Sequence, residues 1–226
     1  MQERSVIARE AAAGLRRFAD QRSKFPVLIG FDGFVDSIIA VVDKRHDVEH
    51  YEPMETIDQL GRRILAAAGQ SSNFELVVKL EKLGGNGPIY ANAMMALGFP
   101  VTYIGARGWP EPHPVFADLN KRARCYSLGP PGMTDAFEFR DGKLMFGKHD
   151  ALKAVNWKAI EDIIGVDKFA EIIAESRLIG TVNWTMLTRL NEIWRKLIDE
   201  LLPACKGPRK LIFVDLADPE KRLRED

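Results

Sequence analysis

The sequence predicts an α/β protein, in which a mostly parallel central sheet is flanked by helices and carries a small β-sheet lid. Short apolar runs alternate with helical patterns along the chain, and a parallel return between strands needs a connection long enough for a helix. Two β-rich stretches, 37–51 and 134–148, interrupt that alternation. We therefore expect these two stretches to form a lid that stands off the central sheet.

Composition and charge narrow the class of protein. The 226 residues carry 32 Lys and Arg against 32 Asp and Glu, so the formal net charge is zero, and 46% hydrophobic residues suffice for a folded core. The balanced charge argues against a nucleic-acid partner, and no apolar run is long enough for a membrane span. The two cysteines, Cys125 and Cys205, lack metal-site spacing, which fits the reducing cytoplasm, where we expect the protein.

Apolar residues at helical spacing predict an N-terminal helical extension over 1–25, ahead of an α/β domain over 26–226. Predicted strands of this domain cover 27–31, 75–80, 101–105, 177–182 and 210–215, and predicted helices cover 56–68, 89–97, 115–123, 157–164, 169–175 and 186–202. Thr56 and Gln59 have the spacing of a reciprocal helix cap, and Asp141-Gly142 suits the tight turn of a hairpin within 134–148.

The first candidate site residues, Asp32 and Asp36, directly follow the strand at 27–31. In open α/β sheets ligands bind outside the carboxyl ends of strands, and carboxylates placed there can accept hydrogen bonds from the hydroxyls of a polyol. The alternative is a pair of solvated carboxylates in an ordinary turn.

The second candidate is the loop Gly84-Gly85-Asn86, which precedes the helix at 89–97. Glycines let the backbone approach a ligand, and a helix start supplies free N–H groups. The alternative is a tight strand–helix turn capped by Asn86. The glycines match neither the GxGxxG nor the P-loop pattern, so dinucleotide binding and P-loop chemistry are unsupported.

Further polar residues give weaker signals. Asn183 follows the strand at 177–182 and can hydrogen-bond a ligand, while the adjacent Trp184 packs. His46 and His50 are four residues apart, but their segment predicts strand or loop and no third ligand is evident. We therefore expect no metal site among the protein side chains.

Taken in order, these motifs resemble the ribokinase-like family of sugar and nucleoside kinases, the phosphofructokinase-B group. The stretch 30–43 (GFDGFVDSIIAVVD) is similar to the family's first strand and lid entry, 83–98 (LGGNGPIYANAMMALG) to its di-glycine segment and helix, and 101–105 (VTYIG) to the strand that follows. The stretch 134–148 resembles the second lid excursion, and 215–222 (DLADPEKR) resembles a segment near the phosphate-transfer site. The resemblance covers the N-terminal two-thirds of the family's length.

The resemblance implies ATP-dependent phosphorylation of a hydroxyl of a sugar or related polyol, with Mg²⁺ bridging the phosphates. The residues that we expect to bind substrate are Asp32, Asp36, Gly84, Gly85, Asn86 and Asn183, and the asparagine usual in the family falls near Ile89. The residues that we expect near the phosphate and Mg²⁺ are Asp215, Asp218 and Arg222.

The family's base and nucleotide pocket lie beyond residue 226, so we expect no catalytic residue here and no phosphorylation by the 226-residue chain alone. A fragment, a truncated gene product and an incompletely recorded chain all stay open. The other hypothesis is a non-catalytic, kinase-like protein that binds a ligand or a partner. We also expect the lid to carry an apolar face, formed by Ile38, Ala40, Val42, Phe137 and Phe139. This face contacts either the substrate cleft or a second lid, and in the second case two copies pair into a homodimer.

Overall fold

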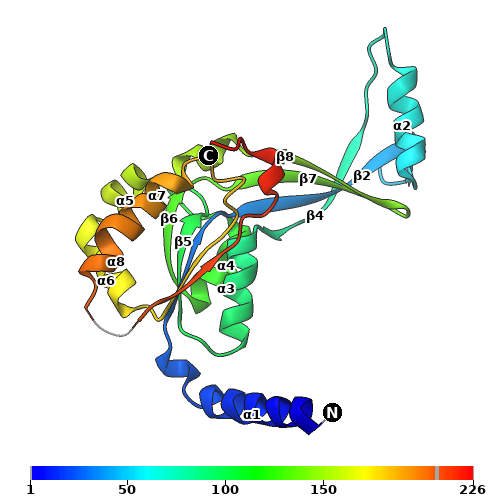
Figure 1. Cartoon of the computed structure of the whole chain (residues 1–226). Coiled ribbons are helices and arrows are strands. Elements are labelled where there is room, and N and C mark those ends of the chain that lie inside the picture. Colours follow the sequence, from blue (N-terminus) through cyan, green and yellow to red (C-terminus); the bar gives the residue numbers. More distant parts are fainter. Residues whose placement is uncertain (1, 207–208, 226) are drawn as a thin grey trace.

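The computed structural model describes residues 2–206 and 209–225 (Figure 1). Within these residues a five-stranded sheet forms the centre, with the strand order β10-β9-β1-β5-β6. Its strands are β1 (Val27–Phe31), β5 (Val101–Ala106), β6 (Arg124–Gly129), β9 (Leu178–Thr181) and β10 (Leu211–Val214). Every neighbouring pair is parallel, as the sequence predicts. The carboxyl ends of these strands therefore meet at one edge of the sheet.

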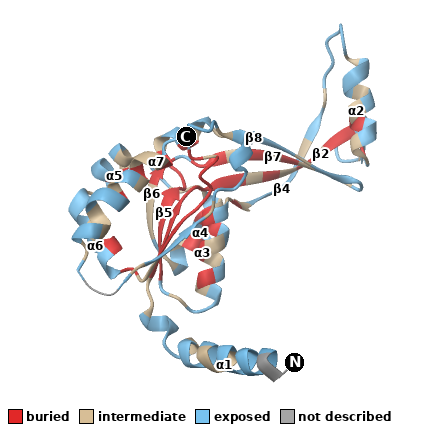
Figure 2. Cartoon of the chain, in the orientation of Figure 1, coloured by how far each residue is buried: buried red, intermediate tan, exposed pale blue. Residues whose placement is uncertain are grey.

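Helices cover both faces of the central sheet, and the buried residues lie between the layers (Figure 2). The flanking helices are α3 (Asn86–Ala96), α4 (Ala117–Arg122), α5 (Trp157–Ile163), α6 (Val166–Glu175) and α7 (Leu190–Lys196). Val27 and Ile29 of β1 pack in one core cluster with Ala91 of α3, whereas Leu28 packs in another with Ile172 of α6. Burial on both faces explains why β1 is a continuous apolar run.

A second sheet, which we call the lid sheet, projects from the main body (Figure 1). It consists of β2 (Phe34–Arg45), β3 (Tyr51–Pro53), β4 (Leu76–Gly84), β7 (Gly132–Phe139) and β8 (Gly142–Lys148). Its order is β3-β2-β7-β8, with β4 pairing antiparallel to β2. The lid sheet is larger than predicted, because the strand expected at 75–80 belongs to it and β2 begins three residues before position 37.

The two faces of the lid sheet differ from the single apolar face that the sequence predicts. Ile38 pairs with Ala136 and Ile39 pairs with Phe137, so Ile38 and Phe137 lie on opposite faces. Phe137 and Phe139 pack in a small core with Leu60 of α2 (Ile57–Ala66). The expected joint face of Ile38, Ala40, Val42, Phe137 and Phe139 is therefore wrong. The exposed apolar side chains of this sheet are instead Leu76, Val78, Leu80, Met145 and Phe146.

Three local predictions can be compared with the structure. Thr56 and Gln59 form the predicted reciprocal cap of α2, which is confirmed. The hairpin turn is Arg140-Asp141 rather than Asp141-Gly142, because Gly142 already pairs with Phe139. The helix expected at 186–202 begins later, as α7, and passes through a π-helical turn (Leu197–Leu201) into α8 (Leu202–Ala204). The wider turn lets the helix continue past its proline.

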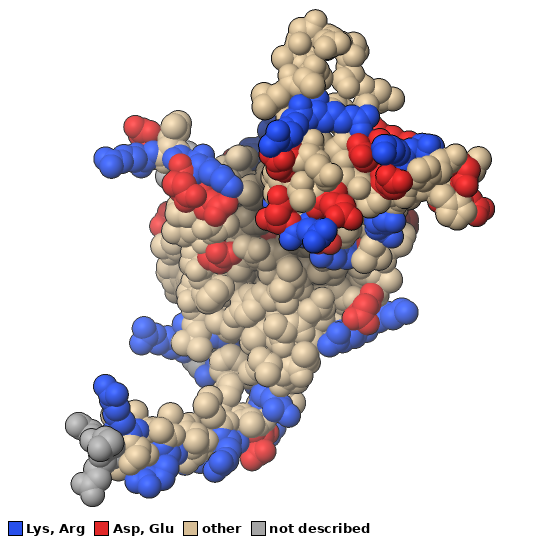
Figure 3. All heavy atoms as spheres, turned by 90° about the vertical axis from the view of Figure 1, so that its right-hand side faces the viewer, with Lys and Arg blue, Asp and Glu red and all other residues tan. Residues whose placement is uncertain are grey.

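The helix α1 (Gln2–Ala19) lies apart from the body (Figure 1). Phe18 joins it to the body, with its ring centroid 5.2 Å from that of Phe25 and 5.9 Å from that of Phe99. On the face shown in Figure 3, positive and negative side chains are interspersed over the lid end. None of the described helices combines the length and apolarity that a bilayer crossing requires. Short 3₁₀ segments cover Arg22–Lys24, Pro114–Phe116, Asp150–Ala154 and Pro219–Lys221.

Candidate functional site

A polar cavity of about 490 Å³ is formed where the lid sheet meets the carboxyl edge of the central sheet. Its walls come from the lid strands β2, β7 and β8, the start of α3, and the segments after β8, β9 and β10. The lining residues are Phe34, Asp36, Gly85, Asn86, Ile89, Thr134, Met145, Gly147, His149, Asn183, Met186, Asp218 and Lys221. This volume is in the range of small-molecule sites, which combine apolar walls with a few polar groups.

Asp36 supplies a free carboxylate to this cavity. It lies on β2 between Lys82 of β4 and Thr134 of β7, and no described group donates a hydrogen bond to its side chain. A Cβ at Gly84 would lie 2.5 Å from the Asp36 carboxylate oxygens, so glycine is what lets this carboxylate sit against β4. The predicted role of Asp36 in binding a substrate hydroxyl therefore has a suitable geometry.

Asp32 lies beneath the cavity rather than in its wall. Its side chain is fully buried, and its Oδ2 accepts hydrogen bonds from Asn86 N at 2.8 Å and Asn183 Nδ2 at 2.7 Å, while Oδ1 accepts one from Gly87 N at 2.7 Å. Burial raises the pKa of Asp32 to about 6, although these hydrogen bonds act in the opposite direction. Both oxygens of Asp32 thus already accept hydrogen bonds within the protein, and its contact with a substrate stays a prediction.

The glycine loop brings the start of α3 close to Asp32. Gly85 has φ = 95°, a left-handed conformation that favours glycine, and it precedes the first helical residue. A Cβ at Gly87 would lie 2.5 Å from Asp32 Oδ1. Asn86 does not cap α3 with its side chain, because Asp32, remote in sequence, accepts the free N–H groups instead. Gly84 and Gly87 thus leave room for the carboxylates of Asp36 and Asp32. Contact between the glycine loop and a ligand stays a prediction.

Asn183 and Asp215 complete a closed set of hydrogen bonds with Asp32 and Asn86. Asn183 is 6% exposed, has φ = 61°, and keeps a buried Oδ1 for which the described residues provide no donor. Asp215 Oδ2 accepts bonds from Asn86 Nδ2 at 2.6 Å and from Asn183 N at 3.3 Å. Asp215 Oδ1 accepts one from Ala217 N at 2.8 Å. Asp215 therefore holds two cavity residues in place and is not itself part of the lining.

The segment after β10 places one cationic group at the cavity. Asp218 and Lys221 both line it and form an ion pair at 2.6 Å. Arg222 turns away, since its guanidinium lies 4.3 Å from the centre of the Trp184 ring and donates to Trp184 O at 3.1 Å. Lys221 rather than Arg222 is therefore the basic residue at the cavity.

The remaining histidines and carboxylates do not assemble a metal centre. His46 bonds to Glu52 and His50 to Asp47, and all four side chains are exposed. In the ranges 2–206 and 209–225, no group of three or more His, Cys, Asp or Glu side chains is placed to hold a metal ion.

Sequence analysis missed much of the apolar and lid-borne lining. Thr134 is the clearest case, because its register opposite Asp36 places both on the same face of the lid sheet. His149, at the end of the lid hairpin, packs edge-on against Phe34 with ring centroids 5.5 Å apart. Partial burial, and then the charge of Lys221, lower the pKa of His149. Side chains alternate between the two faces of β2 and β7, so the sequence could have placed Thr134 beside Asp36 only if the pairing of these strands had been known.

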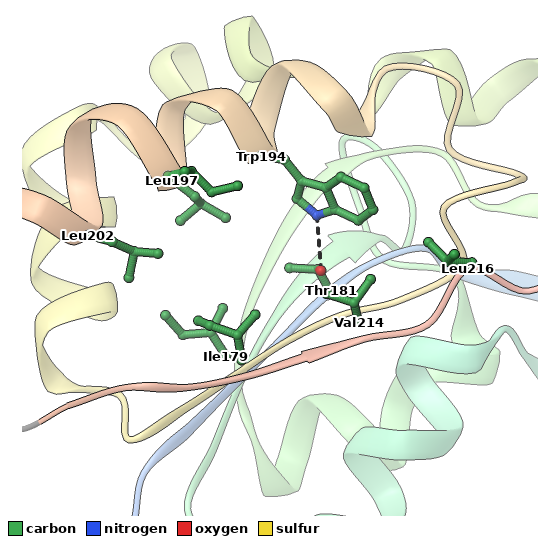
Figure 4. Close-up of a pocket in the computed structure, with 9 residues that line it drawn as sticks. Ile179, Thr181, Trp194, Leu197, Leu202, Val214 and Leu216 are labelled. Carbon is green, nitrogen blue, oxygen red and sulfur yellow. Dashed lines mark hydrogen bonds between the residues drawn. The ribbon is translucent and has the colours of Figure 1, made fainter. Parts of the chain in front are cut away.

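A second cavity, of about 310 Å³, lies between α7 and the strands β9 and β10 (Figure 4). Its lining is apolar apart from Thr181 Oγ1 and Trp194 Nε1, which bond each other at 3.0 Å. Because these two polar groups are already paired, this cavity offers little to recognise a sugar. The polar cavity beneath the lid sheet is therefore the candidate site.

Solved structures confirm the predicted fold class. A fructokinase from Xylella fastidiosa matches with a TM-score of 0.55 and 11% identity, over 90% of this chain and 54% of that chain. A probable sugar kinase from Rhizobium etli matches with a TM-score of 0.53 and 16% identity, over 88% of this chain and 58% of that chain. These similarities show that the described residues share the α/β fold of these two structures.

Sequence comparison gives the family. The family model of prokaryotic ketohexokinase matches residues 5–226. A curated ketohexokinase from Haloferax volcanii is 33% identical over 198 residues, which are 87% of this chain and 52% of that protein. This chain belongs to the prokaryotic ketohexokinase family. It spans about half the length of the curated relative it matches.

Proposed function

We propose that this chain binds a ketose sugar in the polar cavity, and that the protein to which it belongs transfers the γ-phosphoryl group of ATP to a hydroxyl of that sugar. The observation that carries the proposal is the pairing of an unpartnered Asp36 carboxylate with the apolar walls of Phe34, Met145 and Met186. Sugars present hydroxyl donors at their edges and C–H groups on their faces, so a site with both kinds of wall suits them.

ATP and Mg²⁺ are proposed on the basis of family membership. Asp218 and Lys221 are the residues of this chain that we place nearest the transferred phosphate, because both line the cavity at its carboxyl-edge end. Lys221 can pair with phosphate oxygens as a point charge, and Asp218 can accept from a metal-bound water. When bound, ATP supplies the phosphoryl group, and Mg²⁺ neutralises its developing charge. We place the base and the nucleotide pocket in the part of the relatives' length that this chain does not cover.

The direct test is calorimetric titration of the 226-residue chain with D-fructose, and with D-glucose as the aldose comparison. We expect fructose to bind and Asp36→Asn to weaken binding by about ten- to a hundredfold, since a hydrogen bond to a charged group contributes roughly 1.5–3 kcal/mol. Asp135→Asn is the matched control, because Asp135 lies one residue from Thr134 on the opposite face of β7 and pairs with Lys148. Equal affinity in the wild-type chain and in Asp36→Asn would remove Asp36 from the site.

A non-catalytic, ligand-binding protein is the other function compatible with the same cavity. Coupled detection of ADP, with fructose and ATP present, separates the two in a protein of the relatives' full length. Sugar binding without sugar-dependent ADP release there supports the binding protein, and turnover that Asp36→Asn abolishes supports the kinase.

A further inference from the structure

The inner wall of the polar cavity is built on a ring of four side chains that come from four separate segments. Asp32 follows β1, Asn86 begins α3, Asn183 follows β9 and Asp215 follows β10. Each asparagine donates to both carboxylates, once through its main-chain N–H and once through its side-chain Nδ2. Each carboxylate receives both of these donors on its Oδ2 atom.

The chemistry of the ring fixes which way both carboxamides point. An ionised carboxylate can only accept hydrogen bonds, so each asparagine must turn its NH₂ group toward its aspartate. The opposite orientation would bring a carboxamide oxygen against a carboxylate oxygen at the 2.6–2.7 Å separations observed. The amide oxygens of Asn86 and Asn183 are therefore left without a role in the ring.

Those two oxygens belong to side chains that line the cavity. Asn86 is exposed there, and Asn183 keeps a buried Oδ1 that no described donor satisfies. A buried acceptor without a donor costs roughly 1–3 kcal/mol, so a ligand that brings a hydroxyl to it recovers that cost. The carboxylate of Asp36 is a third acceptor at the same cavity.

We propose that Asp32 and Asp215 are positioning residues, which lock the carboxamides of Asn86 and Asn183 so that their oxygens accept hydrogen bonds from substrate hydroxyls. The identity of the ligand rests on the proposed function. The locking of the two carboxamides does not depend on it. Asp32 and Asp215 do not touch the substrate in this arrangement. The side chains of Asn86 and Asn183 then present acceptors to the ligand, which favours hydroxyl donors at this inner wall and disfavours a sugar acid whose carboxylate would face it.

The test measures side-chain amide hydrogen exchange by NMR on the ¹⁵N-labelled 226-residue chain, without sugar. The signals are assigned by their loss in Asn86→Ser and Asn183→Ser, and the exposed Asn73 serves as the internal reference. We expect exchange of the Asn86 and Asn183 amides to be at least about tenfold slower than that of Asn73, because each donates to a carboxylate.

Two variants make the test specific. Asp215→Asn should release the Asn86 amide while the Asn183 amide, held by Asp32, stays slow. Asp32→Asn should give the reverse pattern, whereas a general loss of structure would release both amides. Asp118→Asn, an exposed carboxylate on α4, is the control that should change neither.

Sugar titration of the same variants separates this proposal from the proposed function. Asp215→Asn should weaken fructose binding by roughly tenfold, without a contact of its own to the sugar. The crossed exchange pattern in a chain that binds no sugar would uphold the locking and refute the sugar assignment. Wild-type amides that exchange as fast as Asn73, or an Asp215→Asn variant in which both the Asn86 amide and the sugar affinity are unchanged, would overturn the locking.

Discussion

The buried carboxylate of Asp32 makes the stability of this chain depend on pH in a defined direction. Burial raises the pKa of Asp32 from 3.8 to about 6, and the facing carboxylate of Asp215 adds to that rise. The unfolded chain releases this proton near pH 3.8, so the folded chain binds more protons between that pH and about 6. Stability is therefore greatest below this window and falls as the pH rises through it.

The magnitude follows from the shift itself. A rise from 3.8 to about 6 is roughly two pK units, and at about 1.4 kcal/mol per unit it amounts to about 3 kcal/mol. The other titratable group that contacts residue 32 is Tyr103, whose hydroxyl donates to the main-chain oxygen of Asp32 and whose pKa lies well above this pH range because it is buried. We therefore assign to the Asp32 carboxyl group the difference in pH dependence between the wild-type chain and Asp32→Asn in this window.

The assay is urea unfolding followed by tryptophan fluorescence, for the wild-type chain and Asp32→Asn, at a series of pH values from about 4 to about 7. Because part of this stability is already lost at pH 4, the free energy of unfolding of the wild-type chain should fall by roughly 2–2.5 kcal/mol more than that of Asp32→Asn over this range. Taking the difference between the two free energies of unfolding removes the contributions of carboxylates that both chains share. One of these is Asp47, whose pKa is lowered by its hydrogen bond with His50. Parallel curves for the two chains would refute the assignment, and Asp118→Asn should track the wild type.

Three further predictions concern the glycine loop, the lid and turnover. Gly87→Ala should destabilise the chain by about 1–3 kcal/mol in urea unfolding, because its Cβ would lie 2.5 Å from Asp32 Oδ1, whereas Gly61→Ala on α2, with open space around it, should not destabilise. If the exposed apolar residues of the lid sheet pair two copies, light scattering should report a dimer that Leu80→Lys converts to monomer, and a wild-type monomer at high concentration would exclude this pairing. The 226-residue chain alone should release no sugar-dependent ADP above the background of Asp36→Asn, and turnover above that background would place the catalytic machinery within this chain.

The central sheet was predictable because its signals are local. Continuous apolar runs such as 27–31 and 101–105 can be buried on both faces only within a layered parallel sheet, and the structure places both there. The cap formed by Thr56 and Gln59 is encoded within four residues. Asp36 at the cavity follows from its place after the first strand, where the lid begins.

What the sequence could not supply depends on pairing between distant segments. The strand at 75–80 has the same apolar character in either sheet, so nothing local assigned it to β2. The alternation of residues 38–42 was visible, but which alternate set faces the cavity depends on register, and a shift of one residue exchanges the faces. Asp32 could not be recognised as a buried support, because its partners Asn86 and Asn183 lie 54 and 151 residues away.

The hydrogen-bond acceptors of the cavity come from two separate sheets, and this separation bears on why the Asp36 carboxylate has no partner within the protein. Asn86 and Asn183 are held by carboxylates at the edge of the central sheet, whereas Asp36 lies on β2 of the lid sheet. The sheets join at Gly33, whose oxygen accepts a hydrogen bond from Gly132 N at 2.8 Å, so a rotation of the lid about this junction changes the distance from Asp36 to the two asparagines. A ligand can bind Asp36 and the two asparagines at the same time only when the lid sheet lies close to the carboxyl edge of the central sheet. On the proposed function, the unpaired carboxylate of Asp36 on the lid sheet would therefore couple sugar binding to the position of the lid.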